Sequence, residues 1–468
     1  MAAETYTLLG RSNAAFRSRA ETHTIDGGSV KVIERFFELP LDYANPDGPK
    51  LRIFARNLVP TKKSQNDEQT QLPFILYLQG GPGFECDLET SVQMGGPTLW
   101  LDSRGTGLST PFSAELVEGK TDTQLFDYLK HFRADNIGRW FSNRGRAFIY
   151  DVVRDCEAIR TQLLGHKEDP EDRKWTILGQ SFGGFVALTY LSFYPEGLKE
   201  VFLTAGLTPL VDAPASVFAT LMERVIERNK IYYEKYPRDV HRILNYLDSH
   251  DVRLPNGGRL STGRWLQLGI DFGMHGGIDR VHQLVLRAAN DLELFSKLSY
   301  RLLHKIETKQ ECDSNPFYAI LHEVIYCQGR AANWACGQVL SQYPQFLWDK
   351  AKAQPDVPVY FTGEMVFPEM LEEYANLRSL KTVANMLAEY SEWPALYDKT
   401  QLAKNTVKVT SATYFDDMYV DFNRAQETAR AIGNLEQYIS NQHMHSAIRK
   451  DPATVIGALF KIARRERD

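Results

Sequence analysis

The sequence is poor in cysteine and has no excess of positive charge. Its five cysteines among 468 residues are an odd number, are widely spaced and form no C-x-x-C pair. This pattern argues against a disulfide scaffold or a zinc ribbon and favours buried free thiols. The net charge is -5 at pH 7, whereas a nucleic-acid binder usually carries a basic excess. We therefore expect no nucleic-acid partner.

Long apolar runs are also missing. No run approaches the roughly 18 residues that cross a bilayer, and the first residues lack the apolar stretch of a secretory signal. These features predict a cytoplasmic protein with no membrane partner. They leave open whether the chain forms a homo-oligomer.

Two common cofactor and metal signatures are absent. The glycine-rich residues 79–83 (QGGPG) lack the G-K-[ST] of a nucleotide-binding P-loop. His322-Glu323 does not begin the zinc motif H-E-x-x-H, because position 326 is Tyr. We therefore expect neither a cofactor nor a metal.

Short apolar segments of strand length recur in the first part of the chain, at residues 31–37, 51–59, 74–79, 97–102, 175–178 and 201–203. The polar residues 61–71 between two of them predict a surface loop. Residues 150–164 and 185–195 have apolar side chains at helical spacing and lie between the later segments. Strands that alternate with helices predict an α/β fold with a parallel, doubly wound sheet.

This alternation stops after about residue 208. Helical spacing dominates from residue 213 to about 390, and a strand pattern returns at residues 407–415. We therefore expect an α/β core made of residues 1–210 and 396–468, interrupted by a largely helical insertion of residues 211–395.

Ser181 is the centre of a G-x-S-x-G motif, with Gly179 and Gly183 on either side. The motif lies between an expected strand and an expected helix, which is the context that a nucleophilic serine on a sharp turn requires. Small neighbours leave room for the turn, and the helix N-terminus favours a developing oxyanion. Ser181 is therefore the candidate nucleophile.

A serine hydroxyl needs a base that is oriented by an acid, expected in the chain order Ser, acid, His. Asp416 and Asp417 follow the strand pattern at residues 407–415, and His443 and His445 are the histidines that come after them. The order alone leaves four combinations open.

Backbone amides are the expected oxyanion donors. The glycines of residues 79–83 can bring N–H groups close to a substrate carbonyl. Gly80, Gly81 and the residue after the nucleophile, Phe182, are the candidates for this role.

Three motifs occur in a fixed order: QGGPG at 79–83, DSRGTGLS at 102–109 and GQSFGG at 179–184. Together they resemble the motifs H-G-G-P-G, D-x-R-G-x-G-x-S and G-x-S-x-G-G of the prolyl aminopeptidases (proline iminopeptidases), serine peptidases of the α/β-hydrolase fold. The resemblance covers most of the chain and is patchier in the insertion. It implies an α/β-hydrolase core with a mostly parallel sheet and a large, mainly helical cap.

The resemblance also selects among the open candidates. The family histidine is followed by serine, as His445 is by Ser446, so His445 is preferred. The family spacing from acid to histidine favours Asp417 over Asp416. The implied catalytic residues are Ser181, Asp417 and His445.

One position departs from the family pattern, and two others are expected to be structural. Gln79 stands where the family usually has His, which leaves loop rigidity and substrate preference open. Asp102 and Arg104 are expected to hold the glycine loops through a charge-assisted pair.

Two segments of the insertion resemble family segments in which glutamates bind the free amino group of the substrate. Carried over to this chain, these residues are Glu323 and Glu364, with Glu369 as a third candidate. Paired carboxylates in a closed pocket suit a protonated amine, because each forms charge-assisted hydrogen bonds.

The expected function is that of a serine aminopeptidase that releases N-terminal residues, preferentially proline, from peptides with a free N-terminus. An esterase or another amide hydrolase of the same fold is the first alternative. The second alternative is a non-catalytic binding protein. Carboxylates in the pocket argue against the first, and the complete order of Ser, acid and His argues against the second.

Overall fold

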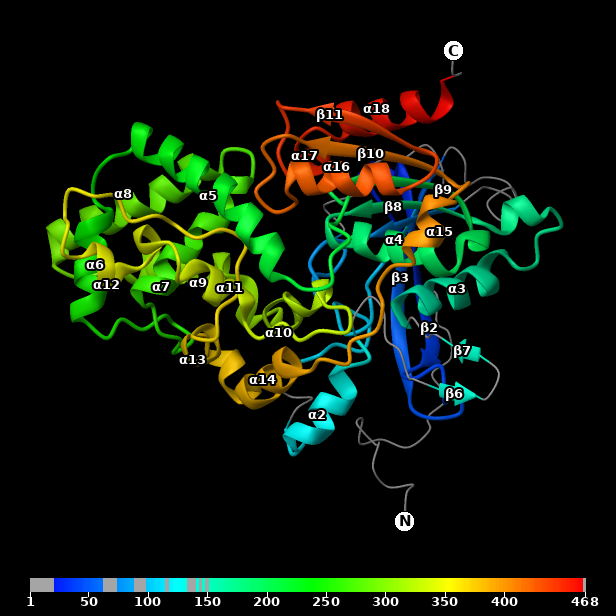
Figure 1. The fold of residues 1–468 in the computed structure, drawn as a ribbon, viewed down its shortest axis with the longest axis horizontal. Coiled ribbons are helices and arrows are strands. Elements are labelled where there is room, and N and C mark those ends of the chain that lie inside the picture. Colours follow the sequence, from blue (N-terminus) through cyan, green and yellow to red (C-terminus); the bar gives the residue numbers. More distant parts are fainter. Residues whose placement is uncertain are drawn as a thin grey trace.

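The computed structural model describes residues 21–61, 74–87, 98–113, 118–132, 140–142, 145–147 and 151–465. In this part of the chain a nine-stranded sheet is flanked by helices (Figure 1). A second sheet has two strands, β6 (Trp140–Ser142) and β7 (Gly145–Ala147). The expected loop at 61–71 lies, beyond its first residue, outside the described residues.

The large sheet has the strand order β1 (Glu21–Ile25), β2 (Val30–Pro40), β3 (Lys50–Pro60), β5 (Thr98–Leu101), β4 (Ile75–Leu78), β8 (Trp175–Gln180), β9 (Leu198–Thr204), β10 (Lys408–Tyr414) and β11 (Leu435–Ser440). The three strand pairs at the β1 end are antiparallel. The pairs from β5 to β11 are all parallel. The expected mostly parallel sheet is therefore confirmed.

Helices cover both faces of this sheet: α3 (Asp151–Leu164), α4 (Phe182–Phe193), α15 (Lys399–Ala403), α16 (Phe422–Ala431), α17 (Ala447–Lys450) and α18 (Pro452–Arg464). A further helix, α2 (Asp122–Leu129), lies beside α14 (Lys381–Glu389). Along β8, Ile177 belongs to the apolar core that contains α3 and α4, and Leu178 to the core that contains α17 and α18. A strand that is buried on both faces reads as a continuous apolar run, which is why its sequence identified it.

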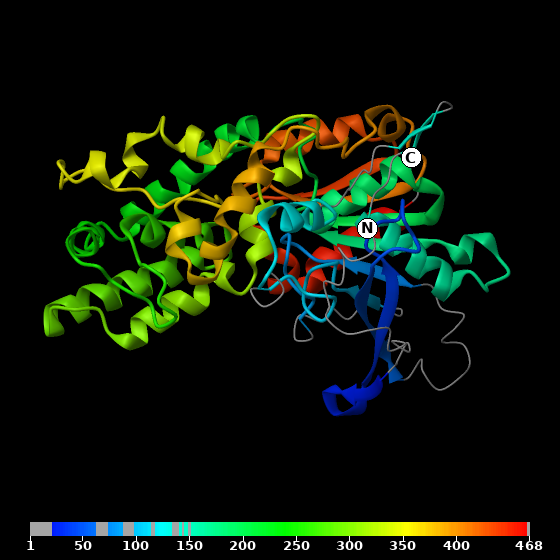
Figure 2. The same cartoon turned by 90° about the horizontal axis from the view of Figure 1, so that it is seen from below.

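The chain between β9 and β10 is helical and is described throughout, with no strand between Thr204 and Lys408. Its α-helices are α5 (Ala215–Lys235), α6 (Val240–Ser249), α7 (Thr262–Leu266), α8 (Gly277–Phe295), α9 (Tyr300–Lys309), α10 (Pro316–Leu321), α11 (Ala335–Leu340), α12 (Trp348–Ala351), α13 (Met370–Glu373) and α14 (Lys381–Glu389). Figures 1 and 2 both show these helices gathered on one side of the sheet. They form the expected helical cap.

The parallel strands bring their carboxyl ends to the same edge of the sheet. The loops that follow β4, β5, β8, β10 and β11 therefore meet there, facing the cap. This edge is where parallel α/β sheets bind their ligands. The segments after β8, β10 and β11 carry the three residues that the sequence marks as candidate nucleophile, acid and base.

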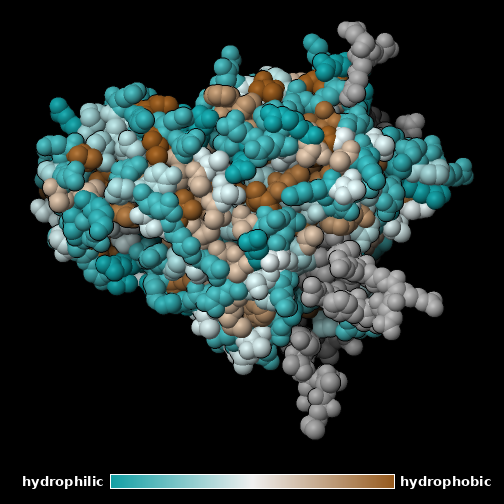
Figure 3. All heavy atoms as spheres, in the orientation of Figure 1, coloured by the Kyte–Doolittle hydropathy of each residue, from teal (hydrophilic) through white to brown (hydrophobic). Residues whose placement is uncertain are grey.

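One face of the molecule is mainly hydrophilic, and the cysteines are buried, as the composition predicts. On the face drawn in Figure 3, hydrophilic residues predominate and hydrophobic ones form small separate groups. All five cysteines are free and buried, as expected. None of the helices in the described ranges has the length and apolar character that a bilayer crossing requires.

Candidate active site

Ser181 occupies a sharp turn between β8 and α4. Its backbone has φ 53° and ψ -118°, a conformation that non-glycine residues seldom adopt. The turn is held because the N–H of Ser181 donates to the carbonyl oxygen of Thr204 at 3.1 Å, and Gly184 donates to the carbonyl of Ser181 at 2.7 Å. The serine is thus presented at the carboxyl end of the sheet.

The glycines around Ser181 are required by close contacts between backbones. A Cβ atom on Gly183 would lie 2.0 Å from the carbonyl oxygen of Leu78. A Cβ on Gly184 would lie 2.1 Å from the carbonyl oxygen of Gly206. Since both neighbours are backbone atoms, no side-chain movement relieves these clashes. The expected lack of room for side chains at this turn is confirmed.

Ser181, His445 and Asp417 lie in one hydrogen-bonded chain. The Nε2 atom of His445 is 2.9 Å from the Oγ of Ser181. The Nδ1 atom of His445 is 2.9 Å from the Oδ2 of Asp417 and 3.1 Å from its Oδ1. His445 and Asp417 are both buried. The structure thus brings together three residues that are distant in sequence.

The backbone of its own loop fixes the Asp417 carboxylate. Its Oδ1 accepts from the N–H of Tyr419 at 2.8 Å and from the N–H of Val420 at 3.0 Å. Burial disfavours a charged imidazole, but the Asp417 carboxylate outweighs this effect and raises the pKa of His445 above its usual value. The ring of Tyr419 packs against that of His445.

The alternative acid and base lie elsewhere. The side chain of Asp416 is 40% exposed and faces Arg224 at 3.4 Å. The Nδ1 atom of His443 is 3.0 Å from the hydroxyl of Ser440, and its Nε2 is 3.6 Å from Asp451. Of the four open combinations, the structure places only Asp417 and His445 in a chain with Ser181.

The candidate oxyanion donors surround the serine. Gly80 and Gly81 line the same cavity as Ser181. Phe182 is the first residue of α4, and its N–H belongs to the first turn, where amides have no partner within the helix. Gly80 and Gly81 thus border the cavity, and Phe182 directly follows Ser181 in the chain.

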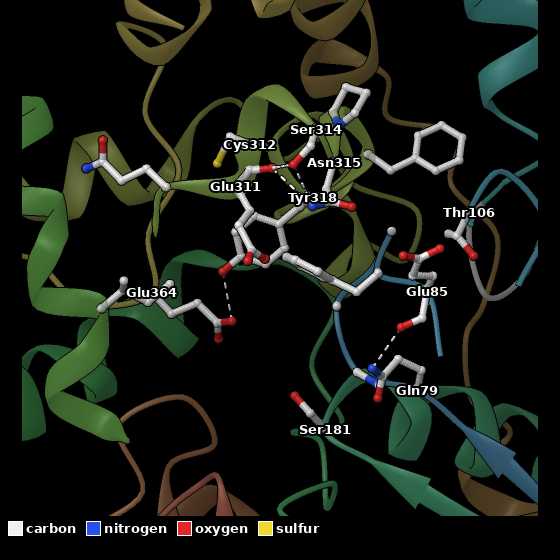
Figure 4. A pocket seen from close by; sticks show the side chains of 18 of the residues that line it. Gln79, Glu85, Thr106, Ser181, Glu311, Cys312, Ser314, Asn315, Tyr318 and Glu364 are labelled. Atoms are coloured by element: carbon white, nitrogen blue, oxygen red, sulfur yellow. Dashed lines mark hydrogen bonds between the residues drawn. The ribbon is translucent and has the colours of Figure 1, made fainter. Parts of the chain in front are cut away.

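Gln79 braces the glycine loop through both ends of its side-chain amide. Its Oε1 accepts from the hydroxyl of Tyr77 at 3.0 Å and from Arg449 at 3.2 Å. Its Nε2 donates to the carbonyl oxygen of Glu85 at 3.1 Å (Figure 4). The residue that departs from the family pattern thus ties the loop to β4, to α17 and to itself.

Asp102 and Arg104 are structural, but the expected pair between them is wrong. Asp102 accepts from the backbone N–H groups of Cys86 at 2.8 Å and Leu108 at 3.0 Å. Arg104 instead forms a bidentate pair with Asp155 of α3, at 2.7 and 2.8 Å. The buried guanidinium thus pairs with an acid far along the chain, while Asp102 accepts from backbone amides.

A cavity of about 950 Å³ opens in front of Ser181, between the sheet edge and the cap. Core residues on its wall include Gln79, Ser181 and His445, and cap residues include Tyr318 and Glu364. In Figure 4, Ser181 points into this space, and Glu364 lies across it. The Ser181 hydroxyl and the Glu364 carboxylate thus border the same cavity.

Glu364 is held as a charged group in the cavity wall. Its side chain is 16% exposed, its Oε1 accepts from the hydroxyl of Tyr318 at 2.9 Å, and its Oε2 is 3.8 Å from the Nε2 of His322. Burial by itself would raise the pKa of Glu364. His322, His445 and Tyr318 outweigh burial and hold that pKa below its usual value.

Glu323 does not join Glu364 in the cavity wall. Its buried carboxylate accepts from the N–H groups of Ala335 at 2.9 Å and Cys336 at 2.8 Å, at the start of α11. Burial raises the pKa of Glu323 to about 7, although the two amides act in the opposite direction. Its neighbour in the chain, His322, lies near Glu364 instead, with Nε2 3.8 Å from the Oε2 of that residue.

The cavity also has lining residues that the sequence analysis did not single out, and one predicted residue does not line it. Tyr318, Tyr419 and Glu311 line the cavity, and burial raises the pKa of Glu311. Tyr419 follows Asp417 by two residues, a nearness that could have marked it, whereas Glu311 looks like any surface carboxylate. Glu369 is exposed and does not line the cavity.

Metal ligands are not clustered in this region. Within the ranges that the structure describes, no group of three or more His, Cys, Asp or Glu side chains is arranged to hold a metal ion.

Two known proteins are similar to the chain over most of its length. It is 38% identical over 455 residues to the proline iminopeptidase of Aeromonas sobria, which covers 94% of this chain and 98% of that protein. It is also 38% identical over 447 residues to the proline iminopeptidase aneH of Aspergillus aculeatus, which covers 93% of this chain and 94% of that protein. No protein-family model matches the chain.

Solved structures that match the chain do so at low sequence identity and low TM-score. The α/β hydrolase MGS-M2 from a deep-sea metagenome library has a TM-score of 0.38 and 10% identity, and covers 90% of this chain and 98% of that chain. Proline iminopeptidase from Mycobacterium smegmatis has a TM-score of 0.37 and 13% identity, and covers 92% of this chain and 100% of that chain.

Proposed function

Since the chain belongs to the proline iminopeptidase family, we propose that Ser181, His445 and Asp417 form the triad with which it releases N-terminal proline from peptides. The chain is a serine exopeptidase of that type. The observation that carries the site assignment is the 2.9 Å contact between the Ser181 hydroxyl and His445, in a cavity that also holds the Glu364 carboxylate.

The reaction begins with proton transfer within the triad. His445 takes the proton of the Ser181 hydroxyl as its oxygen attacks the carbonyl carbon of the first residue. Asp417 keeps the imidazole in the tautomer whose Nε2 can accept. The N–H groups of Gly81 and Phe182 are the proposed donors to the oxyanion of the tetrahedral intermediate, with Gly80 shaping the loop.

The intermediate then collapses, and His445 returns the proton to the leaving amine, so that the shortened peptide departs. The first residue remains as an ester on Ser181. Water attacks this ester while His445 acts again as base, which frees proline and restores the hydroxyl. When the C–N bond breaks, its electron pair goes to the leaving nitrogen, which takes the proton from His445. When the ester bond breaks, its electron pair goes to the Ser181 oxygen, which regains its proton from His445.

Recognition of the amino terminus is assigned to Glu364. A secondary ammonium at the substrate's first residue would lie between the Ser181 side of the cavity and this carboxylate, which the lowered pKa keeps charged. Glu323 supports this wall indirectly, because it fixes the start of α11 next to the turn that carries His322. An esterase pocket would gain nothing from such a carboxylate.

Replacing Glu364 with Gln is expected to raise KM for a free proline anilide about 10-fold to 100-fold, because a hydrogen bond to a charged group is lost. kcat should change much less. Steady-state kinetics with the free and the N-acetylated anilide measure the effect. Glu369→Gln, an exposed change in the same segment, is the matched control and should keep the parental KM. Equal turnover of the blocked and free substrates by the parent enzyme would refute the anchor.

The rate should fall on acidification, with a midpoint above the ordinary histidine value of 6.5. Only neutral His445 can act as base, and Asp417 stabilises its protonated form, so the proton is retained to higher pH than usual. The profile of kcat/KM against pH reports this group in the free enzyme. Thermal unfolding at each pH controls for loss of fold. A midpoint below the ordinary value would contradict the assignment.

The chain's division into domains follows from the same arrangement. We place the core at residues 1–210 and 396–468 and the cap at 211–395, because β9 ends at Thr204 and the cap helices run from Ala215 to Glu389. The substrates are peptides with a free N-terminus. Five free buried thiols support a reducing, cytoplasmic location.

A further inference from the structure

A histidine of the cap, His275, contacts the residues on both sides of His445. It lies between a 3-10 turn of the cap (Gln267–Gly273) and α8, and is half-buried. Its Nε2 is 3.3 Å from the backbone N of Met444, and its Nδ1 is 3.0 Å from the hydroxyl of Ser446. The imidazole of His275 thus holds the residue before and the residue after His445, the base of the proposed triad.

The directions of these hydrogen bonds require a single neutral tautomer. The N–H of Met444 is a donor, so the Nε2 of His275 must be the unprotonated acceptor. The proton then lies on Nδ1, which donates to the oxygen of Ser446. The backbone N–H of His275 donates to the same oxygen at 3.2 Å. A protonated ring would place two donors face to face at Met444.

The surroundings of the ring favour this neutral form. Burial lowers the pKa of His275, and the charges of His443, Lys450 and Arg280 lower it further. Asp451 acts in the opposite direction and is outweighed. Both side-chain hydrogen bonds of His275 are therefore kept in the pH range in which His445 is neutral.

The same cap segment reaches the loop of the acid. The hydroxyl of Tyr419, whose own N–H holds Asp417, donates to the carbonyl oxygen of Ile270. Residues 270–275 of the cap are thus bound to the loops on which the acid and the base of the triad lie.

We propose that His275 is a positioning residue: by holding the residues on either side of His445, it keeps that imidazole within hydrogen-bond reach of Ser181. The inference rests on the proposed triad and goes beyond it. It implies that the chemical step requires the cap to be correctly positioned against the core. His445 lies between β11 and α17, where no regular secondary structure fixes its backbone. A displacement of about 1 Å at a reacting group can lower a rate about 100-fold.

Three substitutions of His275 separate its two contacts. His275→Phe keeps an aromatic ring and loses both hydrogen bonds. In His275→Gln the side-chain oxygen reaches the position of Nε2 and can still accept from Met444. In His275→Asn the amide nitrogen occupies the position of Nδ1 and can still donate to Ser446. His304→Phe, a 54% exposed cap histidine, is the matched control.

The phenylalanine variant is expected to lose about 10-fold to 100-fold in kcat for a proline anilide. KM should stay close to the parental value, because His275 does not line the cavity. The Gln and Asn variants should each recover part of the loss, and His304→Phe should behave like the parent. Rates are expressed per active serine, titrated with a serine-directed phosphonate, and thermal unfolding reports the fold.

A parental kcat per titrated site in His275→Phe would overturn the inference, even with a lower melting temperature, because the residue would then be merely structural. Should that variant fail to fold, Ser446→Ala serves instead, since it leaves His275 in place and removes one partner. It is expected to lower kcat severalfold, and a parental kcat would again overturn the inference. Full activity in Ser181→Ala would reject the triad, and with it this role of His275.

Discussion

Replacing Ser181 with alanine is expected to lower kcat for proline release by roughly a millionfold, because no other group can form the acyl intermediate. The fold should persist. The Ser181 side chain does not cap α4, and its hydroxyl contacts His445 at the cavity wall. Initial rates with a proline anilide, together with thermal unfolding, measure the two effects separately.

Labelling with a serine-directed phosphonate makes this result specific. The parent protein should take up one label, on Ser181, and the alanine variant none, as read by mass spectrometry of the intact chain. Ser341→Ala, a change at an exposed serine after α11, should keep both the label and the activity. Normal turnover by Ser181→Ala, or a label on another residue, would refute the nucleophile.

Asp417→Asn is expected to lower kcat about 10⁴-fold by trapping the wrong imidazole tautomer. The Oδ1 of Asp417 accepts two backbone N–H groups, so the amide oxygen of Asn would stay there. Its NH₂ group would then face Nδ1 of His445 in place of Oδ2, which lies at 2.9 Å. The imidazole would carry its proton on Nε2 and could not accept one from Ser181.

The neighbouring aspartate supplies the matched control. Asp416→Asn changes a partly exposed carboxylate that faces Arg224 and has no contact with His445, so kcat should remain near the parental value. Both variants are compared by kcat and by melting temperature. A large loss in Asp416→Asn with a small one in Asp417→Asn would reverse the assignment of the acid.

Local contacts explain why much of the fold could be predicted from the sequence. β8 is buried along its whole length, so its sequence, WTILGQ, is short, largely apolar and free of charged residues. The glycines next to Ser181 are required by backbone atoms close in space, and their spacing is therefore visible in the chain. By contrast, β11 is half-exposed and carries polar residues such as Glu436 and Gln437, so its pattern gave no strand signal.

The remaining differences arise from contacts between distant segments. Arg104 pairs with Asp155 rather than with Asp102, which is only two residues away. Whether Glu323 or His322 lies close to Glu364 depends on how their helical turn is rotated against α11. The contact of His275 with Met444 joins segments 169 residues apart. No spacing rule within the chain encodes such pairings, because tertiary packing decides them.

β9 and β10 are neighbours in the sheet but are separated in sequence by the whole cap, which has a consequence for synthesis on the ribosome. β9 is complete at Thr204, yet its parallel neighbour begins at Lys408. At typical elongation rates the growing polypeptide leaves one side of β9 without its neighbour for on the order of 10–40 s. During that interval the nucleophile already exists, but the acid and the base have not been made. The nascent chain is therefore inactive as a peptidase and does not cleave other newly made chains nearby.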